Sequence, residues 1–114
     1  MEMTVEKLGA VTRIAPKGNI DSSTAAQFGE QMKRVIASGC SRLVVDMKDV
    51  SYISSAGFRC LLIAEKEAQR AGGHVALCGL AREVHRLFEI GAFTDIFTIG
   101  TSVDDCVARL TKTS

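Results

Sequence analysis

A change of hydrophobic pattern near the middle of the chain limits its fold more than any other feature. Residues 43–47 form a short run of mostly apolar, β-branched residues, which is typical of a buried strand and too short for a helix. From Phe58 to Ala71 the apolar residues follow helical spacing, with charged residues between them. The small residues 54–57 therefore fall where a strand and a loop give way to a helix. The sequence predicts a strand–loop–helix unit at this place.

Similar patterns on both sides of this unit predict the rest of the fold. Predicted strands lie at residues 4–8, 11–15, 43–47, 74–78 and 93–99, and the first two form a hairpin around Gly9-Ala10. Predicted helices begin at Ala25, at Phe58, at Arg82 and after Ser102. The resulting order, β-β-α-β-α-β-α-β-α, implies parallel strands joined by right-handed crossovers after the hairpin. We therefore predict one α/β domain over residues 1–114, with a small mixed, mostly parallel sheet packed against helices.

The predicted helix starts carry capping signals. Thr24 with Gln27 fits a capping box at the first helix, and Asp21 is an alternative cap for the same helix. Ser102 with Asp105 fits a second capping box at the last helix.

Two further residues have a predicted position. Pro16 has no N–H group to donate, so we expect it at a sheet edge or at a strand end. Leu87 is expected on the buried face of the helix at 82–90, beside Val84 and Phe88.

Composition excludes several classes of protein. The formal net charge is +1 and the charges are interspersed, so the sequence predicts no nucleic-acid-binding patch. No apolar run reaches the roughly 20 residues of a membrane span, and no signal peptide is visible, so we expect a cytoplasmic protein. The widely spaced cysteines lack a C-x-x-C pair, which predicts reduced thiols in or near the core and no zinc site; they are Cys40, Cys60, Cys78 and Cys106.

The serine pair before the second predicted helix has several interpretations. A hydroxyl at a helix start caps the helix, acts as a nucleophile or accepts a phosphate, and capping is the commonest of these roles. Three features favour more than a cap at Ser54 and Ser55. Two serines stand where one cap suffices, Ala56 and Gly57 leave room for another molecule, and Phe58 follows within the first turn.

The motifs of common enzymes are absent. The sequence has no G-x-S-x-G, no Walker A motif, no G-x-G-x-x-G and no H-E-x-x-H. His74 and His85 have no sequence relation to the serine pair. Asp46 and Asp49 are possible ligands of a metal ion, but two acidic residues in a loop are usually solvated. We therefore predict no catalytic residues, no metal site and no cofactor.

The central segment also resembles a known family. Residues 49–59 (Asp-Val-Ser-Tyr-Ile-Ser-Ser-Ala-Gly-Phe-Arg) resemble the signature of the anti-sigma factor antagonists, which are bacterial STAS-domain proteins. Residues 18–21 (Gly-Asn-Ile-Asp) are similar to the G-x-[LI]-D element of the family, and residues 84–97 to its C-terminal helix and strand. The resemblance covers nearly the whole chain and implies the STAS fold.

The resemblance also implies a function. The second residue of the small cluster in this family is a serine that an anti-sigma factor with serine kinase activity phosphorylates. Aligned on Gly57, that serine is Ser55; Ser54 is the second choice, since it stands where many members have Asp. The unphosphorylated protein would bind the anti-sigma factor and free the sigma factor, phosphorylation would end the binding, and a serine phosphatase would reset it. The implied docking residues are Asp21, Ser54, Ser55, Gly57, Phe58 and Arg59.

The sequence leaves one alternative function open. The chain could serve as a STAS interaction module in another apparatus, such as a subunit of a lipid-transport complex or a scaffold in a signalling assembly. Both functions rest on protein binding, and an enzyme is the third choice.

Overall fold

The computed structural model describes residues 1–91 and 95–112. Its elements are β1 (Glu2–Leu8), β2 (Val11–Lys17), α1 (Ala25–Ala37), β3 (Arg42–Asp46), α2 (Ser55–Arg70), β4 (His74–Cys78), α3 (Arg82–Ile90), β5 (Thr98–Ile99) and α4 (Val103–Lys112). The five strands form one sheet in chain order, with β1 antiparallel to β2 and all other neighbours parallel. The predicted α/β class, the element order and the mixed sheet are confirmed.

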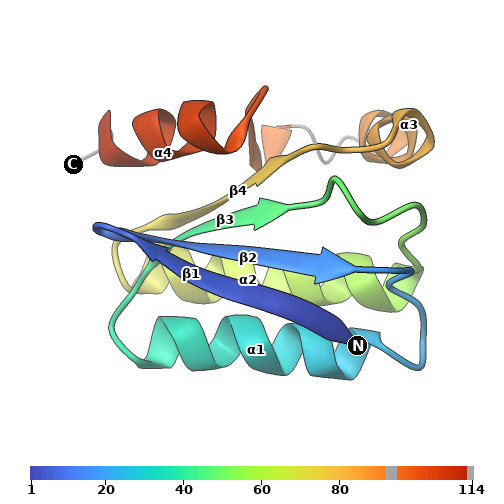
Figure 1. Ribbon diagram of the computed structural model, residues 1–114, viewed down its shortest axis with the longest axis horizontal. Coiled ribbons are helices and arrows are strands. Elements are labelled where there is room, and N and C mark those ends of the chain that lie inside the picture. Colours follow the sequence, from blue (N-terminus) through green and yellow to red (C-terminus); the bar gives the residue numbers. More distant parts are fainter. Residues whose placement is uncertain (92–94, 113–114) are drawn as a thin grey trace.

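The helices cover both faces of the sheet. In Figure 1, α1 and α2 lie side by side on one face and α4 lies on the other. The N-termini of α1 and α2 are at the same end of the molecule, and α3 lies at that end as well. The loops that precede α1 and α2 therefore meet at one edge.

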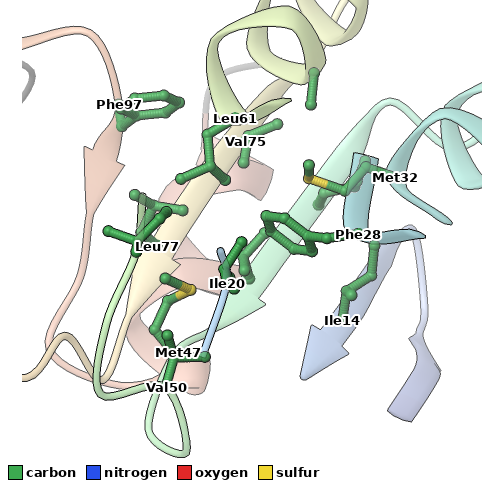
Figure 2. Close-up of a cluster of buried hydrophobic side chains, with 14 of the residues drawn as sticks. Ile14, Ile20, Phe28, Met32, Met47, Val50, Leu61, Val75, Leu77 and Phe97 are labelled. Atoms are coloured by element: carbon green, nitrogen blue, oxygen red, sulfur yellow. The ribbon is translucent and has the colours of Figure 1, made fainter. Parts of the chain in front are cut away.

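The apolar runs of the strands feed two clusters. The larger cluster lies beneath α1 and α2, and Figure 2 shows its side chains, among them Ile14, Phe28, Met32, Leu61, Val75 and Leu77. The smaller cluster lies beneath α4 and comprises Val11, Val44, Ala76, Cys78, Cys106 and Leu110. Neighbouring residues such as Val44 and Val45 point to opposite faces, and both are fully buried. This explains why the strands carry unbroken apolar runs.

The last strand is shorter than predicted. Of the predicted strand at 93–99, only Thr98–Ile99 pairs with β4, while Asp95, Ile96 and Phe97 form a turn. Residues 93 and 94 lie outside the described part of the chain. Phe97 is buried with its ring 5.8 Å from that of Phe88. The ring of Phe97 thus serves core packing rather than strand pairing.

Pro16 lies inside β2, near the end of that strand. It pairs with Met3 of β1, but the pairing of β2 with β3 stops at Ile14. The missing N–H therefore interrupts no bond to β3, as expected of a strand end.

Two predictions about the helices were wrong. The capping box of Thr24 and Gln27 does not form: the Thr24 hydroxyl donates to the Asn19 carbonyl oxygen at 2.9 Å, and Gln27 accepts from the N-terminal amine of Met1 at 2.6 Å. Leu87 is 42% exposed, although Val84 and Phe88 on the same helix are buried as predicted. The apolar stripe of α3 is narrower than its sequence indicates.

The remaining expectations concern single groups. Ser102 Oγ accepts the Asp105 N–H at 3.0 Å, but the Asp105 carboxylate accepts from Thr101 N–H instead, so the second capping box is half formed. All four cysteines are unpaired; two are buried and two half-buried. Within residues 1–91 and 95–112, no helix is both long and apolar enough to cross a membrane.

Candidate functional site

Two loops that are far apart in the sequence are hydrogen-bonded side by side. Gly18 N–H donates to the Asp49 carbonyl oxygen (3.0 Å) and Ile20 N–H to that of Tyr52 (2.9 Å). Ser54 N–H donates back to the carbonyl oxygen of Ile20 (2.7 Å). The segment containing Asp21 therefore lies directly beside the serine pair, and the two motifs recognised in the sequence form one site.

Ser54 is the N-cap of α2. Its backbone is extended (φ −86°, ψ 172°), its Oγ accepts the N–H of Gly57 at 3.3 Å, and its carbonyl oxygen accepts that of Phe58 at 3.0 Å. These bonds satisfy groups that a helix start otherwise leaves without partners. The capping role that the sequence left open between two serines belongs to Ser54.

Ser55 is the first residue of α2 and is exposed. Its hydroxyl forms no hydrogen bond with any other residue in the described part of the chain. The helix begins three residues before the apolar pattern at Phe58, because Ser54 supplies the cap. The arrangement leaves one hydroxyl engaged and the next one accessible.

Gly57 is buried, so it does not leave the open surface that its small size suggested. A Cβ added there would lie 2.6 Å from Ile53 Cγ1 and 2.7 Å from Ile20 Cγ2. Both distances are far below van der Waals contact. Glycine is needed because the first turn of α2 rests on these two isoleucines, which pair as an isolated parallel bridge between the two loops.

Phe58 is half-buried and points toward the core rather than lying open on the surface. Its ring centroid lies 4.7 Å from that of Phe88, and the two planes are tilted by 54°. Such aromatic pairs contribute about 0.5–1.5 kcal/mol beyond the area they bury. Phe58 therefore fixes the first turn of α2 against α3.

Asp21 carries a stabilised negative charge beside Ser54. Its Oδ1 accepts from the Ser23 hydroxyl (2.6 Å), the Ser23 N–H (2.9 Å) and the Thr24 N–H (3.2 Å). These hydrogen bonds, the Ser23 hydroxyl above all, hold the pKa of Asp21 below its ordinary value. Thr24 occupies the N-cap position of α1 without a side-chain cap bond, and Asp21 instead accepts N–H groups of the turn that leads into the helix.

Arg59 is exposed one turn after Ser55 and forms no ion pair with the residues that the structure describes.

Tyr52, which the sequence reasoning did not single out as a site residue, is 50% exposed in the loop just before the serines. The available signal was an aromatic residue in that loop between Ser51 and the buried Ile53. Asp46 and Asp49 do not form the possible cation site. Asp46 is buried, and its carboxylate is paired with the Arg13 guanidinium at 2.9 Å.

Comparison with known proteins identifies the family of this chain. Residues 2–106 match the family model of the STAS domain. The chain belongs to the STAS domain family. This STAS domain is 31% identical over 108 residues to a protein from Bordetella bronchiseptica that bears the name "Putative anti-sigma factor antagonist BtrV". The alignment covers 95% of the chain and 93% of BtrV, so the predicted membership of the anti-sigma factor antagonist family is confirmed.

Solved structures confirm the STAS fold. A protein from Thermotoga maritima, described as "a putative anti-sigma factor antagonist", aligns with a TM-score of 0.90 at 16% identity, over 96% of this chain and 94% of that one. The Bacillus cell fate determinant SpoIIAA in its phosphorylated form aligns with a TM-score of 0.74 at 14% identity, over 95% and 98% of the two chains. At these identities the likeness concerns the fold.

Proposed function

We propose that this STAS domain is a cytoplasmic anti-sigma factor antagonist that phosphorylation of Ser55 switches off. Its partner is an anti-sigma factor with serine kinase activity, and binding of that partner frees the sigma factor. The observation that carries the proposal is the division of roles in the serine pair: Ser54 caps α2, and Ser55 presents an exposed hydroxyl beside Asp21. The name of BtrV and the phosphorylated form of SpoIIAA support the same function.

The chemistry belongs to the kinase. The Ser55 oxygen attacks the γ-phosphorus of the kinase's ATP, an O–P bond forms, and the bond from the γ-phosphorus to ADP breaks. The hydroxyl proton leaves to a base of the kinase. The STAS domain supplies the acceptor and the docking surface, and acts by binding rather than by catalysis.

The phosphate should leave the domain folded. It adds a charge of about −1.5 to −2 at the positive end of α2, where anions are favourable. Arg59 lies one turn further along the helix, at the i, i+4 spacing that brings side chains together. The domain therefore accommodates the charge without unfolding.

The phosphate instead acts on the docked partner. With the stabilised charge of Asp21 nearby, the docking edge becomes strongly negative. Bringing like charges together at an interface costs several kcal/mol, and each 1.4 kcal/mol is about tenfold in affinity. One phosphate is thus sufficient to end the binding, and a serine phosphatase restores it.

Site mapping of the phosphate tests the proposal. The wild type, Ser55→Ala and Ser54→Ala are each incubated with the anti-sigma serine kinases of the same organism and Mg-ATP, and phosphate is located by mass spectrometry. We expect phosphate on Ser55 in the wild type and in Ser54→Ala, and none in Ser55→Ala. Phosphate on Ser54 would move the acceptor by one residue, and no phosphate with any of these kinases would overturn the switch.

A further inference from the structure

An apolar groove lies along the face of α2 that begins at Ser55. The groove has a volume of about 350 Å³, and Arg59, Leu62, Ile63, Lys66 and Ile96 contribute to its lining. The α2 residues follow Ser55 at helical spacings of three and four, so they share its face of the helix. Ile63 is 53% exposed and Ile96 is 44% exposed, which leaves an uncovered apolar surface beside the phosphorylation site.

The exposed charges of the groove are cationic. Arg59 and Lys66 stand at the solvent side, and neither forms an ion pair with a residue of the described segments. The acidic residue of the groove, Glu65, is only 3% exposed and already accepts the Val75 N–H at 2.7 Å. The groove therefore combines apolar walls with positive charge that no neighbouring carboxylate neutralises.

The shape of the groove fits a helix. Side chains spaced by three and four residues form the ridges between which the ridges of a second helix pack. From Ser55 to Lys66 the stripe runs for roughly 17 Å, about three turns. A bound helix of this length meets both cations and the apolar walls between them.

We propose that this groove binds an amphipathic, acidic helix of the anti-sigma factor. The apolar side of that helix packs on Ile63 and Ile96, and its carboxylates face Arg59 and Lys66. The inference rests on the proposed function and extends the docking surface from the edge at Ser55 along α2. Arg59 then links the two, because a phosphate on Ser55 competes with the partner's carboxylates for the same guanidinium.

Binding of the kinase that phosphorylates Ser55 is measured by calorimetry for the wild type, Ile63→Ser and Lys66→Glu. The controls are Val5→Ser, another change from a β-branched apolar residue to serine, and Lys7→Glu, both at exposed positions of β1. We expect about tenfold weaker binding for each groove variant, and controls within about twofold of the wild type. The groove variants should also raise the KM for Ser55 phosphorylation with little change in kcat, since the acceptor is unaltered. Thermal unfolding verifies that each variant is folded.

The outcomes separate this inference from the proposed function. If the wild type binds no anti-sigma kinase, the proposed function fails and the inference fails with it. If Ser55→Asp weakens binding but both groove variants match their controls, the proposed function stands and the groove inference is overturned. If the wild type forms dimers that Ile63→Ser disperses while kinase binding is unchanged, the groove joins two copies of this chain, which also overturns the inference.

Discussion

Ser54 donates its backbone N–H to the carbonyl oxygen of Ile20 at 2.7 Å. This bond joins the two loops that lead into α1 and α2, and it lies one residue from both Asp21 and Ser55. The position of the Ser55 hydroxyl therefore depends on Ile20 and its neighbours as much as on α2. We expect changes on either loop to affect the proposed phosphorylation site at Ser55.

Ser54→Ala tests the cap. The change removes the oxygen that accepts the Gly57 N–H, and loss of an N-cap typically costs about 1 kcal/mol. Chemical denaturation should show this loss, whereas Ser54→Asp should restore most of the stability because Asp also caps. Ser55→Ala removes an exposed hydroxyl and should change stability by less than about 0.5 kcal/mol. Equal losses for the two alanine variants would contradict the assigned roles.

Ser55→Asp tests the switch. Asp is a favourable residue in the first turn of a helix, so the variant should unfold at nearly the same denaturant concentration as the wild type. It should bind the anti-sigma kinase more weakly than the wild type, with a smaller loss than the phosphorylated protein, because phosphate carries more charge and bulk. Calorimetry on the wild type, Ser55→Asp and the phosphorylated protein gives the order of their affinities for the kinase. Equal affinities for all three would contradict a switch by charge.

Asp21 predicts an acid-sensitive contribution to stability. Its pKa is lowered from 3.8 in the folded protein, mainly by the Ser23 hydroxyl. Because this pKa is lower in the folded than in the unfolded state, the Asp21 carboxylate stabilises the folded protein at pH values above the unfolded-state pKa. That stabilisation is lost as the pH falls through the folded-state pKa. Chemical denaturation at pH 7 and between pH 4 and about 2 gives the free energy of unfolding as a function of pH. We expect that free energy to fall less in acid for Asp21→Asn than for the wild type. An unchanged acid profile would contradict the assigned hydrogen bonds.

Local patterns predicted the elements better than their ends. The helix at 82–90 matches α3, because apolar spacing and Gly91 both mark it. The apolar pattern predicts the start of α2 three residues late, because Ser55, Ala56 and Gly57 carry no apolar periodicity and only the cap at Ser54 fixes the boundary. Thr24 was assigned a capping role from its spacing to Gln27, whereas Asp21 supplies the acceptor in the structure.

Contacts between distant segments could not be predicted from spacing. The family resemblance indicated that Asp21 and Ser55 share a site, but nothing local shows that Ile20 pairs with Ile53. The small size of Gly57 suggests room for a partner, since a sequence does not show which side chains lie beneath a glycine. The structure places Ile20 and Ile53 there.

Gly57→Ala tests that packing. The added methyl would lie 2.6 Å from Ile53 Cγ1 and 2.7 Å from Ile20 Cγ2. Overpacking of this kind costs about 1–3 kcal/mol, which outweighs the gain in helix propensity of about 1 kcal/mol. Gly29→Ala in α1 is the matched control, since its nearest neighbour is the movable Cys60 thiol at 2.9 Å. We expect a clear loss of stability for Gly57→Ala and little change for Gly29→Ala.

The Arg13–Asp46 pair gives the sharpest test of the sheet. Asp46 has a side chain that is 6% exposed, and its Oδ2 accepts from Arg13 Nε at 3.2 Å and Nη2 at 2.9 Å. Arg13→Met leaves that carboxylate buried without its cation, which typically costs about 3–5 kcal/mol.

Lys17→Met supplies the control on the same strand. Lys17 pairs with Glu2 at 4.0 Å, and both side chains are mostly exposed, so this change should cost less than about 1 kcal/mol. Urea denaturation of the two variants gives the comparison. If Arg13→Met is as mild as Lys17→Met, Asp46 has found water or another partner and the buried pair does not hold β2 to β3. If it is severe, Arg13→Met/Asp46→Asn should recover part of the stability, because the double change removes the uncompensated charge as well.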